Sequence, residues 1–294
     1  YLLIYDLRVF VLFRFFYIFE ETNTSLIMKQ ILILFISITT FAQSKLDKEI
    51  AIILEEGKLL YNSEIASWYG TDIFLEVYKE REKIGGYFSY TDSNNLSKCI
   101  FFSKEDKPKV IGAINFESTI KLETAKADLK VREFTKNELE LYKLRKEALT
   151  IIYSDTIFKT YSNTNFNVIP IINKNQKKVF VLTGPKINNI VILGNDYLLN
   201  FDKNNKLLNR RALHKNIIPI QIDEDKELEA TMHNHLHETG DLITSTDICT
   251  LMLYGKIYNM KQHFVISEKY VSIWNCETDT LNVMTTEAFE KMAK

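Results

Sequence analysis

Three of the five histidines in this chain fall within five residues, at His233, His235 and His237, and a carboxylate follows at Asp247. On a β-strand, side chains two residues apart share one face, so a strand that runs up to His235 presents the imidazoles of His233 and His235 to a single ion. Neutral imidazole is the commonest protein ligand for metal ions. A helix that begins near Asp247 and folds back over the strand end brings a carboxylate oxygen within the ~2.0–2.2 Å that zinc requires. The pattern predicts a Zn²⁺ site formed by His233, His235 and Asp247.

Each of these residues also has a simpler interpretation. His233 and His235 are compatible with surface positions on a loop. Thr244-Ser-Thr-Asp247 resembles a capping box, in which the carboxylate of Asp247 serves only the helix N-terminus. His237 shares the face of the other histidines only if the strand continues through Leu236, and we expect His237 in the loop instead.

The order His-x-His, polar loop, Ser/Thr-x-x-Asp and helix resembles the JAB/MPN (JAMM) metalloprotease family. The family pattern is His-x-His-Pro-x(6)-Ser-x-x-Asp with a distant upstream Glu, and this chain has His233-Asn-His235-Leu236-x(7)-Thr244-x-x-Asp247. Leu replaces Pro, the loop is one residue longer and Thr replaces Ser, so all three ligand positions remain filled. The resemblance covers roughly residues 135–275 and implies a zinc-dependent hydrolase of peptide or isopeptide bonds.

The mechanism that this resemblance implies needs a general base. In the family, zinc lowers the pKa of a bound water, a Glu takes its proton, and the Ser hydroxyl helps to stabilise the oxyanion. Thr244 supplies a similar hydroxyl here. The family's Glu lies on an early strand, but the predicted strands Asn167–Ile172 and Lys178–Thr183 contain no Glu. Glu238 is the candidate base closest in sequence to the histidines.

Two further carboxylates, Glu227 and Glu229, precede the histidine strand, and each is otherwise interpreted as a solvated side chain. The missing Glu favours an alternative function, a catalytically inactive exported protein that keeps the JAB-like fold and binds a protein or cell-wall component. The chain lacks the His-Glu-x-x-His, Gly-x-Ser-x-Gly and Walker A motifs. A dyad of Cys249 with a histidine is an alternative, but Cys249 falls inside a predicted helix, where we expect it to be packed.

The N-terminal region predicts export. Met28 resembles a start, so Tyr1–Ile27 is interpreted as a non-native upstream extension. Lys29, the apolar run Ile31–Phe41 and a small-residue cleavage site form a signal peptide over residues 28–42. The ending Phe-Ala-Gln-Ser resembles secretory signals of Bacteroidota. We therefore expect a periplasmic or extracellular protein that begins near Gln43, without a membrane span in the mature chain.

Composition and patterning predict an α+β fold. The net charge of −1 and the lack of long basic runs argue against nucleic acid as a partner and leave a protein or peptide substrate. Residues 43–130 form helices with a small antiparallel sheet, and residues 131–294 form the JAB-like domain. The predicted helices are one or two over Leu46–Tyr69, with Gly57 as a weak point between them, and then Asp72–Lys83, Thr135–Ile152, Thr246–Tyr258 and Thr286–Lys294. The predicted strands are Gly86–Thr91, Lys98–Ser103, Pro108–Glu117, Asn167–Ile172, Lys178–Thr183, Ile190–Phe201, Leu207–Leu213, Lys226–His235, His263–Ser267 and Tyr270–Asn275.

Overall fold

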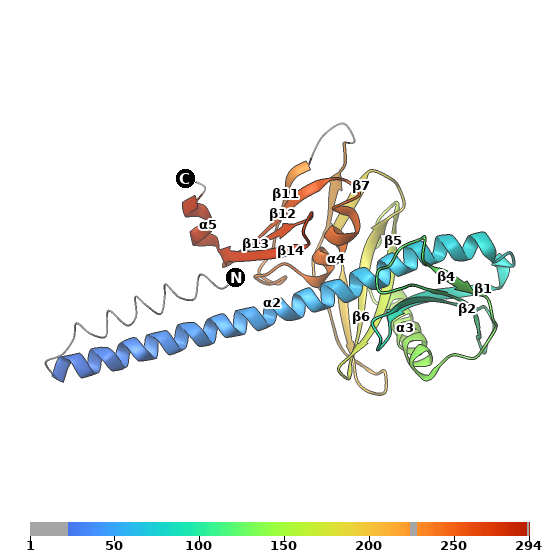
Figure 1. Ribbon diagram of the computed structural model, residues 1–294, viewed down its shortest axis with the longest axis horizontal. Helices are drawn as coiled ribbons and strands as arrows, with labels where there is room; N and C mark the ends of the chain where they lie inside the picture. The colour runs from blue at the N-terminus through green and yellow to red at the C-terminus, as the bar shows by residue number, and fades with distance from the viewer. Residues whose placement is uncertain (1–22, 224–227, 293) are drawn as a thin grey trace. The chain divides into compact units, whose positions relative to one another are not determined.

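The computed structural model describes residues 23–223, 228–292 and 294 (Figure 1). The chain divides into two compact units, residues 1–52 and 53–294. Residues 1–22 of the predicted upstream extension lie outside the described residues. The predicted signal peptide, residues 28–42, lies in the first helix, and because the structure does not test it, it stays a prediction. None of the helices in the described part combines the length and the apolar composition that a membrane crossing requires.

The helix α2 (Asn23–Val77) is continuous, so of the one or two helices that the pattern allows over Leu46–Tyr69 the structure has one, and Gly57 does not interrupt it. The separate helix Asp72–Lys83 is wrong. Only a short 3-10 turn, η1 (Arg81–Lys83), follows α2. Gly57 lies where α2 approaches a later helix: a Cβ atom at this position would stand 2.7 Å from Cγ2 of Ile248. The glycine therefore permits close helix packing, and this packing offsets the loss of about 1 kcal/mol of helix propensity.

The α+β fold class is confirmed, and an antiparallel sheet of four strands follows α2 in the order β1-β2-β3-β4. Its strands are β1 (Ile84–Thr91), β2 (Ser97–Ser103), β3 (Val110–Asn115) and β4 (Lys126–Asp128). Phe74 of α2 stacks on Phe101 of β2 with ring centroids 3.8 Å apart. This stacking joins the helix to one face of the sheet.

The helix α3 (Lys136–Ser154) begins at the predicted capping box, in which Thr135 and Glu138 satisfy each other's backbone N–H groups. Glu138 also accepts hydrogen bonds from Arg132, at 2.6 and 2.8 Å. The buried face of α3 packs on the second sheet through Leu144 and Ala148.

The second sheet is antiparallel with the order β5-β6-β8-β9, and a separate ladder pairs β7 with β10. Its strands are β5 (Thr164–Asn173), β6 (Gln176–Pro185), β8 (Tyr197–Phe201) and β9 (Leu207–Ala212), and the ladder contains β7 (Ile190–Gly194) and β10 (Ile217–Gln221). The predicted strand Ile190–Phe201 is thus two strands in different sheets. Gly194 and Asn195, with φ of 74° and 51°, turn the chain between them.

The third sheet, β11-β12-β13-β14, contains a parallel pair. Its elements are β11 (Leu228–Asn234), α4 (Ser245–Tyr254), β12 (Met260–Ile266), β13 (Tyr270–Asn275) and β14 (Thr280–Thr285), and α5 (Thr286–Met292) follows. The first two residues of the predicted strand Lys226–His235 lie outside the described residues. Because β11 and β12 are parallel, the chain must cross over between them, and α4 forms that crossover. The N-terminus of α4 therefore follows the end of β11 that carries the histidines.

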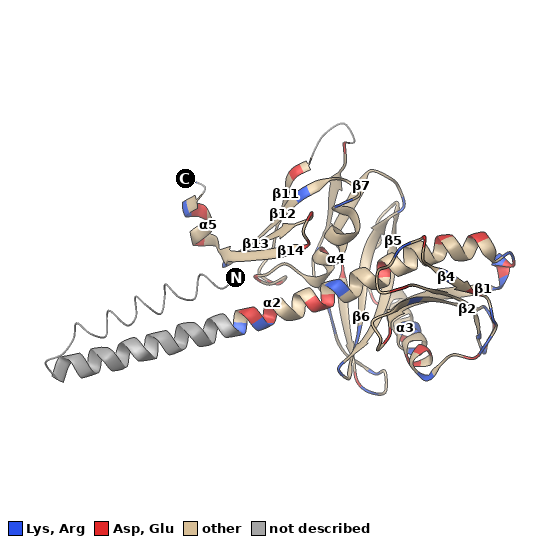
Figure 2. Ribbon diagram, in the orientation of Figure 1, with Lys and Arg blue, Asp and Glu red and all other residues tan. Residues whose placement is uncertain are grey.

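Helix α4 is buried on both sides. Ile248 and Leu251 belong to a core with Trp274, whereas Cys249 and Leu253 belong to a core formed with α2 and the second sheet. All three cysteines are free and buried, including Cys249, which the sequence predicts to be packed inside a helix. Across the described elements, Lys and Arg are interspersed with Asp and Glu (Figure 2). Packing of α4 from two sides fixes the position of its first turn.

We expect Gly57→Ala to destabilise the protein. At an open helix position this change stabilises by about 0.5–1 kcal/mol, because alanine has the higher helix propensity. Here the new methyl group overlaps Ile248, and overpacking of a core costs about 1–3 kcal/mol. Urea unfolding measures the sign of the change in the free energy of unfolding. A stabilised Gly57→Ala would show that the two helices do not pack closely.

Candidate metal centre

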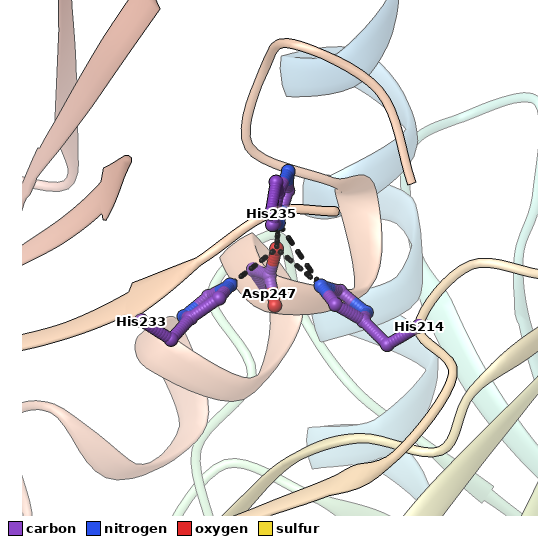
Figure 3. A group of neighbouring side chains, drawn as sticks. All are labelled: His214, His233, His235 and Asp247. Atoms are coloured by element: carbon purple, nitrogen blue, oxygen red, sulfur yellow. Dashed lines mark hydrogen bonds and ion pairs between the residues drawn. The ribbon is translucent and has the colours of Figure 1, made fainter. Parts of the chain in front are cut away.

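Four buried side chains converge on one point of the second unit: His214, His233, His235 and Asp247 (Figure 3). One ligand atom from each lies within 4.8 Å of the ligand atoms of the others. The residues come from the β9–β10 connection, the end of β11 and the first turn of α4. The structure thus brings together the three predicted ligands and adds a histidine that the sequence does not indicate.

The end of β11 presents its two histidines on one face, as the sequence predicts. His233 and His235 are buried, and Asn234 and Leu236 between and after them are exposed. His235 lies one residue beyond the strand, but its backbone N–H donates to the carbonyl of Ile266 at 2.8 Å. This bond continues the ladder to β12 and keeps the alternation of faces.

Asp247 acts as a helix cap and faces the histidines at the same time. Its Oδ2 accepts from the backbone N–H of Thr244 at 3.0 Å and from the Thr244 hydroxyl at 2.8 Å. The same oxygen lies 3.5, 3.8 and 3.5 Å from Nε2 of His214, His233 and His235. The two interpretations of Asp247 are therefore compatible, because the capping geometry places the carboxylate in the cluster.

His214 is held by a second buried carboxylate, Asp196. Oδ1 of Asp196 accepts from Nδ1 of His214 at 2.8 Å and from its backbone N–H at 3.0 Å, and Oδ2 accepts from the Thr246 hydroxyl. The sequence signal for His214 is weak. It directly follows the predicted strand Leu207–Leu213, but no spacing relates it to a histidine 19 residues later.

The hydrogen-bond partners assign the tautomers of His214 and His235. Nδ1 of His214 faces a carboxylate, and Nδ1 of His235 faces the Gly240 carbonyl at 3.3 Å. Both partners only accept, so each Nδ1 carries the proton and each neutral ring has its lone pair on Nε2. These two Nε2 atoms are 3.0 Å apart. Two facing lone pairs at this distance repel each other, and either an added proton or a cation between them removes the repulsion.

His233 continues the same arrangement through a third imidazole. Its Nδ1 lies 2.8 Å from Nε2 of His263, and Nδ1 of His263 lies 2.8 Å from the Thr231 hydroxyl. A proton on each Nδ1 satisfies both contacts and leaves the lone pair of His233 Nε2 directed into the cluster. That Nε2 and Oδ1 of Asp247 are buried without a hydrogen-bond partner. Unpaired buried polar atoms are costly, and coordination of an ion would use the lone pair of His233.

The dimensions of the cluster suit a four-coordinate ion. Ligands at about 2.0–2.1 Å from a tetrahedral metal stand about 3.3–3.4 Å from one another. The Nε2 atoms of His214 and His235 are 3.0 Å apart, Oδ2 of Asp247 lies 3.5–3.8 Å from the three Nε2 atoms, and no two ligand atoms are more than 4.8 Å apart. Each imidazole also donates its Nδ1–H to an acceptor, an arrangement that orients metal-bound histidines. The group can therefore hold a metal ion with small movements.

Burial and charge prepare the cluster for a cation. Burial lowers the pKa of His233 to about 4 and that of His263 to about 3, so both rings are neutral at neutral pH. Burial acts to raise the pKa of Asp247, but His214, His233 and His235 outweigh it and hold this pKa well below its usual value. The metal-free cluster therefore keeps an ionised carboxylate beside the neutral imidazole of His233.

His214 differs from the other histidines. Burial acts to lower its pKa, but the nearby carboxylates of Asp196 and Asp247 outweigh burial and raise the pKa to about 9. In the metal-free protein this ring carries the proton that separates its Nε2 from that of His235. A metal ion must displace that proton.

The remaining predicted site residues lie in different surroundings. Thr244 is buried at the start of α4 and touches Asp247. Glu238 and His237 lie in the exposed turn after the histidine strand, and Glu238 is 3.8 Å from the amine of Lys215. The structure thus brings Thr244 to the cluster and leaves the candidate base Glu238 on the surface.

Three other candidates also lie elsewhere. Glu229 contacts Lys261 on the neighbouring strand. Glu227 lies outside the described residues. Cys249 is fully buried on α4, and burial raises the pKa of its thiol well above the usual value, as expected for a packed residue.

Comparisons of the chain with protein-family models, with curated proteins and with solved structures found no match.

We expect metal binding to release one proton from His214. Because its pKa is about 9 in the metal-free protein, the ring is protonated at lower pH, and the apparent affinity for zinc should rise about tenfold per pH unit between about pH 7.5 and 8.5. Titration calorimetry in buffers with different ionisation enthalpies measures the released proton. His214→Gln should bind more weakly and without this slope. An affinity independent of pH in this range would contradict the protonation state of His214.

Asp196→Asn should weaken metal binding about 10–100-fold, because it removes the negative charge that orients His214 and increases its basicity. Competition against a chromophoric chelator measures the change. Asp241→Asn is the matched control, since Asp241 pairs with Lys269 at 2.7 Å and contacts no residue of the cluster. Equal affinities of the two variants would show that Asp196 does not support the site.

Proposed function

We propose that this chain is an exported zinc-binding protein with a JAB/MPN-like domain, in which four protein ligands enclose the ion. His214, His233, His235 and Asp247 supply three imidazole nitrogens and one carboxylate oxygen, a donor set that suits zinc. One observation carries the proposal. A catalytic zinc site has three protein ligands and a water, but here the imidazole of His214 stands where the water would bind. The function that follows is binding of a partner by a fold that the metal stabilises.

Burial of the ligands supports a closed site. Their side chains are at most 4% exposed, in His214, and those of His235 and Asp247 are 0% exposed. Among the described residues, the carboxylate of Asp196 contacts the ligand His214, but it already accepts from His214 and Thr246. A general base needs a free carboxylate within reach of a metal-bound water, and Asp196 does not meet this requirement.

The ion would act as a cross-link between three segments. His214 follows the second sheet, His233 and His235 end β11, and Asp247 begins α4. A ligand that binds only the folded state stabilises it by about 2.7 kcal/mol at a free concentration 100 times its Kd. The stabilisation would be largest where these segments meet, because a preformed set of ligands does not exist in the unfolded chain.

A zinc-dependent hydrolase of peptide or isopeptide bonds is the second candidate. The observation that favours it is the position of Thr244, whose hydroxyl lies beside Asp247 as the resemblance to JAMM proteases implies. In this function His233, His235 and Asp247 would hold the ion, and a water would occupy the position that faces His214. A bound zinc would supply Lewis acidity there, and the Thr244 hydroxyl would have to turn from Asp247 to reach the oxyanion.

We expect about one zinc per chain by elemental analysis of the purified protein. The double variant His233→Ala/His235→Ala should contain no zinc, because it removes two of the four donors. His237→Ala is the matched control and should retain the metal, since His237 lies in the exposed turn. A wild-type protein without zinc, even after incubation with excess zinc at pH 8, would refute the proposed site.

His214→Ala separates the two candidate functions. For a closed site, the variant loses affinity for zinc and thermal stability, and neither protein cleaves peptides. For a hydrolase, the vacated position admits water, and the variant retains zinc and gains peptidase activity against a quenched peptide library. Cleavage by the wild-type protein that is abolished with His233→Ala/His235→Ala would also assign the hydrolase.

A further inference from the structure

We propose that a second site, separate from the metal cluster, binds a small zwitterion of the amino-acid or dipeptide class, with its carboxylate on Arg145 and its ammonium group on Glu64. The site is a cavity of about 790 Å³ between α2, β1, β5 and the C-terminal end of α4. It has the size of a typical small-molecule site. The proposal holds whether or not a metal occupies the histidine cluster.

Arg145 is the feature that points to an anion. Its Nε donates to the carbonyl of Val168 at 3.3 Å, and within the described part of the chain no carboxylate lies within ion-pair distance of its guanidinium. The side chain of Arg145 is half-buried, and this burial lowers its pKa. Partly buried guanidinium groups usually pair with carboxylates or phosphates, and the planar fork of Arg binds a carboxylate through two hydrogen bonds. The Nη groups of Arg145 are available for this contact.

Glu64 supplies the opposite charge in the same cavity. Its Oε2 accepts from Nδ2 of Asn167 at 2.6 Å, which fixes the carboxyl group at the cavity wall. Burial raises its pKa to about 7, although Asn167 and Arg145 act in the opposite direction. Glu64 and Arg145 thus influence each other without forming a direct ion pair. A ligand with both charges can satisfy both groups at once.

The charges of the wall favour a zwitterion over a phosphate compound. Besides Glu64, the carboxylate of Asp72 lines the cavity, and Lys186 lines it with a second positive charge. A dianionic phosphate would meet two carboxylates, whereas a zwitterion meets groups of both signs. The cavity therefore selects for balanced charge.

An aromatic wall provides the apolar part of the site. Trp68 and Tyr254 line the cavity with ring centroids 6.1 Å apart, and Tyr254 stacks with Tyr258 at 6.2 Å. Trp68 of α2 is 41% exposed and Tyr87 of β1 is 38% exposed, so both rings can contact a ligand. Aromatic surfaces of this kind bind apolar and aromatic side chains. We therefore expect the ligand to carry an aromatic or large apolar side chain.

The cavity also has room for more than one amino acid. A neighbouring hollow of about 550 Å³ shares Ser63, Ser89 and Pro170 with it. The Ser63 hydroxyl donates to the backbone carbonyl of Ser89 at 3.2 Å, which joins α2 to β1 at this point. A dipeptide is therefore included in the ligand class.

The test uses the full chain and defined probes. Ligand-observed NMR and calorimetry would measure binding of L-phenylalanine, Gly-Phe and Phe-Gly at up to about 10 mM, a range that detects millimolar Kd values. L-Phenylalanine amide lacks the carboxylate and N-acetyl-L-phenylalanine lacks the ammonium group. We expect at least one of the three parent compounds to bind, and removal of either charge to weaken binding of L-phenylalanine or the corresponding dipeptide derivative at least about tenfold.

Variants assign the contacts. Arg145→Gln should weaken binding at least about tenfold and Arg145→Lys should weaken it less, because Lys keeps the charge but lacks the fork. Glu64→Gln should remove the preference for the ammonium group. Arg211→Gln is the matched control, because Arg211 is an exposed residue of β9 outside the cavity.

Two results would overturn the proposal: none of the three parent compounds binds, or the neutralised derivatives bind the wild-type chain as tightly as their parents. The derivatives are tested on the wild-type chain, so this outcome does not depend on the folding of any variant. Zinc content, measured in parallel, reports on the metal cluster alone. A wild-type chain that contains no zinc but binds the zwitterion would refute the proposed metal site without affecting the proposed cavity site.

Discussion

The carboxylate of Asp247 is the constraint on which the centre of this molecule depends. It is fully buried, and a buried ionised carboxylate is stable only when it is paired or hydrogen-bonded. One of its oxygens accepts from Thr244 and faces three imidazole nitrogens, so the start of α4, the end of β11 and the loop with His214 must meet at one point. The packing of α4 against Gly57 and Trp274 fixes that point from two sides. The helix cap at Thr244, the crossover helix α4 and the histidine cluster therefore depend on one another.

The hydrogen bonds beyond the four ligands decide what the cluster is suited to do. His214 is held by Asp196, His235 by the Gly240 carbonyl and His233 by His263. Each contact fixes a ring with its Nε2 directed inwards, which favours a metal but also resists replacement of a ligand by water. An enzyme needs one position that exchanges readily, and the raised pKa of His214 means that a proton competes more strongly with the metal at this histidine than at His233. His214 thus completes the four-ligand site and would be the first ligand to be replaced.

The sequence predicts the positions of the helices and strands better than it predicts which strands pair. Period and turn residues locate most helices and strands within a few residues, and they place His233 and His235 on one face because alternation along a strand is local. The capping pattern likewise locates Asp247. The sequence leaves open whether Gly57 interrupts the helix, because glycine has two physical uses, as a helix breaker and as a site of close approach, and only the partner Ile248 distinguishes them. The contribution of His214 depends on how two sheets meet, which no local pattern encodes.

The cavity beside Arg145 shows the opposite use of buried charge. At the metal cluster, opposite charges are brought into contact and enclosed, whereas in the cavity Arg145 and Glu64 are held apart by their own neutral partners, Val168 and Asn167. Contact between the two would have satisfied both groups at little structural cost, because a paired charge is cheaper to bury than two separate ones. A separation maintained by fixed neutral contacts leaves the remaining hydrogen-bonding capacity of both groups for a third molecule. Helix α4 borders both sites, with Asp247 in its first turn and Tyr254 as its last residue.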